Sequence, residues 1–112
     1  MISRKYRASR IDIERAIKTG FSVNGDFLYA KVLEKGVEKL GFSIIISKKV
    51  EKTSVGRHHI KRLISSIIEE KIKENSFFSN KIVVFFVKKA EKIDFSVKIR
   101  KDTEKILSKI FA

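Results

Sequence analysis

The sequence predicts an α+β fold, an α/β sandwich in which a four-stranded mixed sheet packs against three helices. Three stretches suit helices by their apolar spacing or their capping pattern, and four short segments in the intervening chain are rich in branched and aromatic residues. The length of 112 residues, of which 43% are hydrophobic, suffices for one core and leaves no room for a second. We therefore treat residues 1–112 as a single domain.

The first helix is predicted over residues 9–20. Ser9 is a suitable N-cap, and Asp12 follows three residues later, as in a capping box. Gly20 is expected to end the helix in the left-handed conformation that glycine adopts readily. The apolar face of this helix is made of Ile13, Ala16 and Ile17.

Three strands are predicted next, over residues 21–23, 27–33 and 40–47. The first two are joined by Asn24-Gly25, a strong turn dipeptide. In the third strand, apolar side chains occupy both faces, which predicts a central position in the sheet rather than an edge. The residues concerned are Ile44, Ile45 and Ile46.

The longest helix is predicted over residues 54–75, followed by a loop at 76–80, a fourth strand at 81–88 and a final helix at 96–111. The long helix has a buried stripe made of Ile60, Leu63, Ile64, Ile67, Ile68 and Ile72. The final helix is expected to bury Ile99, Ile106, Leu107, Ile110 and Phe111. The order is α-β-β-β-α-β-α, and the helix between the third and fourth strands permits these two to pair in parallel.

The charge balance indicates the kind of partner. Basic residues number 26 and acidic residues 13, which gives a net charge of +13 and an isoelectric point of about 10.1, so a polyanion is the expected partner. The chain has no cysteine, which excludes a disulfide scaffold, a thiol nucleophile and a cysteine-ligated metal. No apolar run is long enough to span a bilayer, and we expect a cytoplasmic protein.

The densest basic segment runs from Lys48 to Arg62 and contains six lysines and arginines against one acid. Within the predicted helix, several of these residues lie four apart and share the exposed face opposite the isoleucine stripe. Cations near the free N–H groups of a helix start favour phosphate. The segment predicts a phosphate-binding surface that includes Lys48, Lys49, Lys52, Arg57, His58, Lys61 and Arg62, with both arginines facing solvent. The alternative is a solvated helix face.

Two further groups suit RNA. Residues 1–8 form a basic N-terminal arm that continues into the first helix and is expected either to order on RNA or to remain a solvated tail; its binding candidates are Arg4, Arg7 and Arg10. In the second strand, Phe27 and Tyr29 alternate with Lys31, and an aromatic and cationic strand face stacks unpaired bases. For Phe27 the alternative is a place in the core.

The sequence predicts no catalytic residue and no metal site on the polypeptide. The acids are scattered, whereas metal-assisted phosphodiester hydrolysis needs clustered ligands. His58 and His59 are adjacent, and adjacent helical side chains diverge by about 100°, so they cannot flank one phosphate. If phosphate is cleaved, the metal must be held elsewhere.

Two motifs resemble the signature of a known family. They are Leu40-Gly41-Phe42-Ser43-Ile44-Ile45-Ile46-Ser47-Lys48-Lys49-Val50 and Arg57-His58-His59-Ile60-Lys61-Arg62-Leu63-Ile64. In this order they are similar to the pattern of the bacterial ribonuclease P protein component, and residues 12–29 are similar to its first helix and first two strands. The chain departs from the pattern at three places: histidines replace an asparagine and an arginine at 58 and 59, Glu51 replaces the usual glycine, and isoleucines replace aromatic residues at 13 and 17.

The resemblance implies a ribosomal protein S5 domain 2-like sandwich whose βαβ crossover is left-handed, against the usual rule. It also implies the accessory protein subunit of a ribonucleoprotein endoribonuclease that removes the 5′ leader from precursor tRNA and gives the mature 5′ end. The RNA and its bound Mg²⁺ would perform the hydrolysis. The catalytic RNA would contact Arg57, His58, Lys61 and Arg62, with Lys48, Lys49 and Lys52 extending that surface. The floor of a cleft for the single-stranded leader would be Ile13, Ile17, Phe27 and Tyr29.

The implied partners are the catalytic RNA and precursor tRNA, with no membrane and no required protein partner. One alternative is a ribosomal-type protein that binds rRNA without a role in cleavage. Another is a peripheral protein on anionic lipid, which needs an exposed apolar helix face. The isoleucine stripe of the long helix is needed for the core instead.

Overall fold

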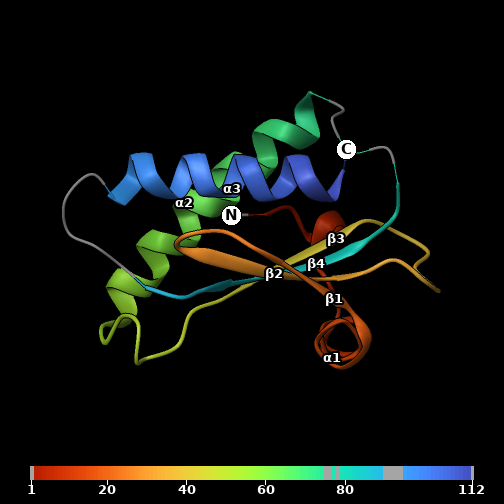
Figure 1. Ribbon diagram of the computed structural model, residues 1–112, viewed down its shortest axis with the longest axis horizontal. Helices are drawn as coiled ribbons and strands as arrows, with labels where there is room; N and C mark the ends of the chain where they lie inside the picture. Colours follow the sequence, from red (N-terminus) through yellow and green to blue (C-terminus); the bar gives the residue numbers. More distant parts are fainter. Residues whose placement is uncertain (1, 75–76, 78, 90–94, 112) are drawn as a thin grey trace.

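The computed structural model describes residues 2–74, 77, 79–89 and 95–111. The elements are η1 (Arg4–Tyr6), α1 (Arg10–Thr19), β1 (Phe21–Asn24), β2 (Leu28–Leu33), β3 (Gly41–Ile45), α2 (Ser54–Lys73), β4 (Ile82–Val87) and α3 (Phe95–Ile110). Figure 1 shows the layers: α1 lies alone below the sheet, and α2 and α3 lie above it. The predicted α+β order is confirmed, with the short helix η1 as an unpredicted addition. Asn75, the predicted end of the long helix, and residues 76 and 78 of the predicted loop lie outside the described residues.

The sheet is mixed, with the strand order β1-β2-β4-β3. β2 pairs antiparallel with both β1 and β4, whereas β3 and β4 are parallel. The parallel pairing expected from the helix between β3 and β4 is confirmed. In this pairing Ile45 lies opposite Phe86, so the carboxyl ends of the two strands are at the same end of the sheet.

The prediction that the third strand is central is wrong, because β3 forms one edge of the sheet. The N-terminal segment covers part of that edge: Arg7 forms a parallel bridge with Phe42, and the Ala8 N–H donates to the Phe42 carbonyl at 3.0 Å. Ile2 is buried in the main core. Residues 2–8 therefore pack on the domain, and this cover explains how an edge strand has so apolar a sequence.

The predicted N-cap of α1 is confirmed, but the predicted left-handed conformation at its C-terminal end is wrong. The Ser9 hydroxyl accepts a hydrogen bond from the Asp12 N–H at 3.2 Å, as the capping pattern predicted. Gly20, however, has φ −75° and ψ 161°, which is extended and not left-handed. An added Cβ would lie 2.6 Å from the Val32 carbonyl oxygen and would also collide with the Ala16 carbonyl. Glycine is needed here because α1 and β2 approach closely.

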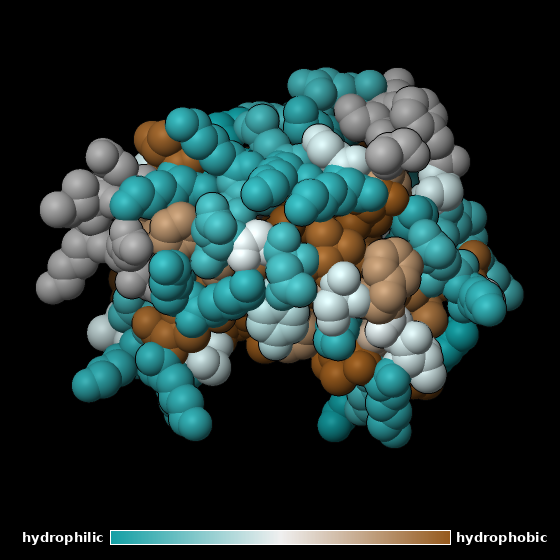
Figure 2. Space-filling view, viewed as in Figure 1, coloured by the Kyte–Doolittle hydropathy of each residue, from teal (hydrophilic) through white to brown (hydrophobic). Residues whose placement is uncertain are grey.

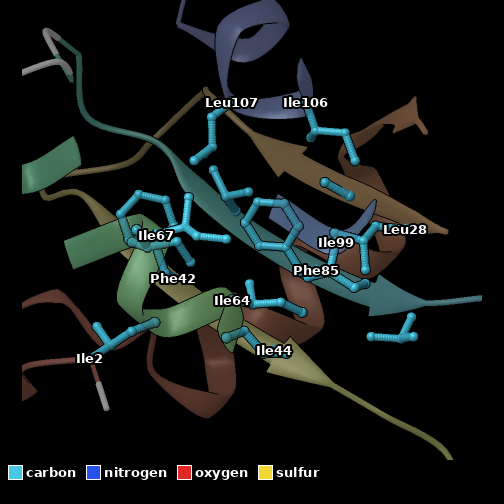
Figure 3. Close-up of a cluster of buried hydrophobic side chains, with 14 of the residues drawn as sticks. Ile2, Leu28, Phe42, Ile44, Ile64, Ile67, Phe85, Ile99, Ile106 and Leu107 are labelled. Carbon is cyan, nitrogen blue, oxygen red and sulfur yellow. The ribbon is translucent and has the colours of Figure 1, made fainter. Parts of the chain in front are cut away.

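The main core lies between the sheet and the pair α2 and α3 (Figure 3). Its central side chains include Leu28, Phe42, Ile64, Ile67, Phe85, Ile99 and Ile106. A second, smaller cluster lies between α1 and the sheet and consists of Ala16, Leu33, Ile82 and Val84. Ala16 is the one residue of α1 that is fully buried, so α1 contacts the sheet through a narrow strip.

A buried carboxylate fixes the turn between β1 and β2. Asp102 of α3 is 4% exposed and accepts hydrogen bonds from the N–H groups of Asp26, Phe27 and Leu28 at 2.9, 3.0 and 2.8 Å. These bonds satisfy the carboxylate and tie the turn to α3 across 74 to 76 residues of chain. No pattern in the sequence marks Asp102 for this role.

Candidate nucleic-acid interface

The basic residues between Lys48 and Arg62 form a surface at the start of α2. We call Lys48, Lys49, Lys52, Arg57, His58, His59, Lys61 and Arg62 the α2 basic surface. The opposite face of the helix buries Ile60, Ile64, Ile67 and Ile68, which confirms the predicted phase of the helix. Six of the eight side chains are exposed, whereas Arg57 and Lys61 are half-buried. Long hydrophilic side chains also dominate the face of the molecule seen in Figure 2.

The prediction that Arg57 faces solvent is wrong. Its side chain is half-buried and donates hydrogen bonds to the loop before α2. One guanidinium nitrogen donates to the carbonyl oxygens of Glu51 and Lys52 at 3.0 and 2.9 Å. Thr53 caps the same helix, since its hydroxyl accepts from the Gly56 N–H at 3.0 Å. Arg57 therefore holds the loop before α2 in place, and Arg62 is the arginine that faces solvent freely.

Carboxylates do not neutralise this surface in the part of the chain that the structure describes. Among the described residues, the ion pairs of α2 lie in its C-terminal part, where Arg100 of α3 contacts Glu70 through two nitrogens at 3.1 and 3.2 Å. These hydrogen bonds lower the pKa of the Glu70 carboxyl and raise the pKa of Arg100. Glu51, the one acid in the segment, accepts hydrogen bonds from Thr53. The positive charge at the start of α2 thus remains available to a polyanion.

The three N-terminal candidates, Arg4, Arg7 and Arg10, lie at different places in the fold. Arg7 lies beside Lys61, since both line a cavity of about 190 Å³ next to Ser43 and Ser65. The Arg7 Nε also donates to the Ile2 carbonyl at 2.9 Å. Arg4 is exposed on η1, and Arg10 is exposed at the start of α1, where it pairs with Glu14 at 3.6 Å. Arg7 is thus the N-terminal candidate that the structure brings next to the α2 basic surface.

A second group lies on the sheet face that α1 partly covers. Tyr29 and Phe86 are direct cross-strand neighbours, and their rings stack with centroids 4.8 Å apart and planes 9° from parallel. By the same register, Lys31 and Ile45 lie on this face, next to the aromatic pair. All four side chains are half-buried. We call Tyr29, Lys31, Ile45 and Phe86 the aromatic strip.

One of the predicted cleft residues, Ile13, borders this strip from α1. Ile13 is half-buried and packs against the small cluster that also contacts Ile45 and Phe86. Ile17 lies one turn further along and is 42% exposed. The structure thus brings Ile13, Ile17 and Tyr29 to the α1 side of the sheet.

Phe27 does not belong to this group: the alternative of a place in the core is confirmed, and its implied place in the cleft floor beside Tyr29 is wrong. Its ring packs against the main core on the other side of the sheet and meets Phe95 of α3 edge-on at 6.1 Å. The cause is local: β2 begins at Leu28, and Asp102 holds residues 26–28 in the turn. The alternation of faces within a strand therefore does not extend to Phe27.

Phe86 is the site residue that the sequence analysis missed. Because Ile82 to Val87 are all apolar, hydropathy alone does not distinguish the two faces of the fourth strand. Adjacent strand residues point to opposite faces, so of Phe85 and Phe86 one had to lie on the α1 side. Phe85 is fully buried and Phe86 is half-buried. The Phe-Phe pair was the signal that could have located this ring.

The two groups lie at the same end of the sheet. Ile45 ends β3 opposite Phe86, and the chain then continues through residues 46–53 into α2. Within the described residues, no group of three or more histidine, aspartate or glutamate side chains could hold a metal ion. No described helix is long and apolar enough to cross a membrane.

Comparison with known proteins agrees with this architecture. The family model for ribonuclease P matches residues 3–111. The Staphylococcus aureus RNase P protein matches with a TM-score of 0.77 at 22% identity, over 98% of this chain and 100% of that one. The Thermotoga maritima RNase P protein matches with a TM-score of 0.64 at 16% identity, over 96% of this chain and 92% of that one. A comparison with curated proteins gives no match. Since the family model covers nearly the whole chain, the chain belongs to the ribonuclease P protein family.

Proposed function

We propose that this chain is the protein subunit of ribonuclease P, which binds the catalytic RNA and the 5′ leader of precursor tRNA. It assists the RNA- and Mg²⁺-dependent removal of that leader, which gives the mature 5′ end of the tRNA, in the cytoplasm and without a further protein partner. Membership of the family supports the RNA partner and the role in tRNA processing. The α2 basic surface supports a contact with the catalytic RNA, and the aromatic strip supports a separate contact with the leader.

The α2 basic surface suits the catalytic RNA because its cations are held by a helix whose other face is core. Lysine and arginine neutralise phosphates and release counterions, which supplies most of the sequence-independent affinity for RNA. Arg62, Lys48, Lys49 and Lys52 are exposed, and Lys61 and Arg7 meet at the adjacent cavity. The histidines at 58 and 59 complete the surface.

The aromatic strip suits an unpaired leader. Aromatic faces stack on bases of any sequence, and a nearby lysine contacts the backbone. Ile13 and Ile17 of α1 would form one wall, and Tyr29 and Phe86 the floor. Mg²⁺ would be held mainly by the RNA, and the polypeptide contributes binding and not bond cleavage.

The observation that carries the proposal is the place of both groups at one end of the sheet, in a chain of this family. An RNA held by α2 there is close to a strand lying on Tyr29 and Phe86. One molecule can therefore contact the catalytic RNA and the leader together.

Reconstitution tests the proposal. The purified protein is added to a bacterial ribonuclease P RNA at low Mg²⁺, and leader removal from precursor tRNA is measured. We expect the rate to rise with the parent protein and with Lys105→Ala, an exposed change on α3, and to rise less with Lys48→Ala/Lys49→Ala. RNA binding without any increase in the rate of cleavage would refute the proposal and favour the ribosomal-type alternative.

A further inference from the structure

Both histidines of the chain lie at the start of α2. The sequence contains two, His58 and His59, and both side chains are exposed. Within the described residues, neither imidazole has a hydrogen bond or an ion pair. They lie on the α2 basic surface, between Arg57 and Lys61, where the family pattern has an asparagine and an arginine.

The charged groups around them are almost all positive. On α2 itself these are Arg57, Lys61 and Arg62. From the preceding loop they are Lys48, Lys49 and Lys52, with Glu51 as the one acid, which accepts two hydrogen bonds from Thr53. The N-terminal segment adds Arg7 beside Lys61. Among the described residues of the N-terminal segment, the loop and the start of α2, Glu51 is the one acid, so an anionic ligand is the source of counter-charge that the surface calls for.

Imidazole is the side chain whose charge ordinarily changes between pH 5 and 8, and an adjacent anion favours its charged form. An RNA phosphate brought to this surface supplies such an anion. Adjacent helical positions point about 100° apart, so the two rings meet different parts of the RNA backbone and each can take up a proton of its own.

We infer that RNA binding at the α2 basic surface is coupled to proton uptake by His58 and His59, so that affinity rises as the pH falls. The inference rests on the proposed function, since it needs RNA at this surface. At residue 59 this chain would then have a charge that depends on pH, whereas the family pattern has an arginine, which is always charged. Binding then releases counterions and takes up protons together.

The test is the dissociation constant of the complex with ribonuclease P RNA at pH 6 and pH 8, at fixed ionic strength and Mg²⁺. For an imidazole of ordinary pKa that stays charged over this range in the complex, linkage gives a gain of about 25-fold between pH 8 and pH 6, and two such imidazoles give about 600-fold. His58→Asn/His59→Arg has no imidazole and should bind with nearly equal affinity at both pH values. The single change His59→Arg should keep one imidazole and about a 25-fold dependence.

Calorimetry in buffers of different ionisation enthalpy counts the protons directly. The parent should take up protons on binding near pH 6.5, and the double variant should take up none from imidazole. Because the double variant retains the N-terminal amine and meets the same RNA, it controls for other titrating groups. Circular dichroism checks that both proteins are folded.

The outcomes separate this inference from the proposed function. Tight binding with the same pH profile in the parent and the double variant would overturn the proton coupling and leave the proposed function standing. A failure of the folded parent to bind the RNA at either pH would overturn both.

Discussion

The salt dependence of RNA binding tests the α2 basic surface most directly, and Arg62→Ala is the change that isolates one contact. Arg62 is exposed and makes no hydrogen bond within the described residues. Its removal therefore subtracts one charge and leaves the loop before α2 intact. Arg57→Ala is less informative because it also removes two hydrogen bonds to loop carbonyls.

The expected magnitude follows from the charges in the segment. Lys48 to Arg62 contains six lysines and arginines. If each neutralises one phosphate, the slope of log affinity against log salt concentration is about −4.2 to −5.4, which is a loss of about 300- to 2,000-fold in affinity between 50 and 200 mM salt. Arg62→Ala should make the slope shallower by about 0.8 and weaken binding about sixfold at 100 mM salt.

The assay is a titration of labelled ribonuclease P RNA with protein at five or more salt concentrations, with Mg²⁺ and pH held constant. Lys105→Ala, exposed on α3, is the matched control and should leave the slope unchanged. The reasoning is refuted if Arg62→Ala keeps the parent slope, or if Lys105→Ala reduces it as much.

Three other changes test the strip, the turn and the contact between α2 and α3. Tyr29→Ala removes one ring of the stacked pair and should weaken binding of precursor tRNA by about 1–3 kcal/mol per base lost, but not of mature tRNA, when the two are compared in holoenzyme binding assays. Asp102→Ala leaves three N–H groups without their acceptor and should lower the free energy of unfolding by about 3–5 kcal/mol in urea denaturation, whereas Lys101→Ala on the same helix should change it little. The lowered pKa of Glu70 means that its pairing with Arg100 stabilises the fold above pH 4.5 and loses that effect as the pH falls through the lower folded value. Urea denaturation between pH 5.5 and 3 should therefore show a smaller decline in Glu70→Gln than in the parent.

The sequence predicted the elements that local physics determines. The isoleucine stripe fixed the phase of α2, the Ser9 and Asp12 pattern located the start of α1, and the intervening helix predicted the parallel pairing of β3 and β4. The family motifs led to the α2 basic surface. Each of these signals is contained within a few turns of chain or follows from a general rule of connection.

The errors share one cause, which is contact between distant segments. β3 has an apolar sequence on an edge because residues 2–8 cover it, and Phe27 turns toward α3 because Asp102, 75 residues away, holds the turn. Gly20 is required by the Val32 carbonyl of a neighbouring strand and not by its own dihedral angles. No local pattern encodes such contacts, so periodicity could not reveal them.

The aromatic strip is only half-buried because α1 is too narrow to cover the whole sheet. Figure 1 views α1 end-on below strands that run across the picture, so the helix crosses them. A helix is about 10 Å wide with its side chains, and a six-residue strand such as β2 is about 20 Å long, so about half of the strand length remains uncovered. Leu33, Ile82 and Val84 lie where α1 covers the sheet, and Tyr29 and Phe86 lie on the part of the strands that α1 leaves uncovered.

Two half-exposed rings at the uncovered end are stabilised by stacking on each other, which orders them before any ligand binds. A base that stacks there does not have to order loose side chains, and that saving adds to its affinity. The short, narrow α1 therefore leaves the rings accessible: a longer cover would bury them, and a helix without the small Ala16 at its contact would stand further from the sheet.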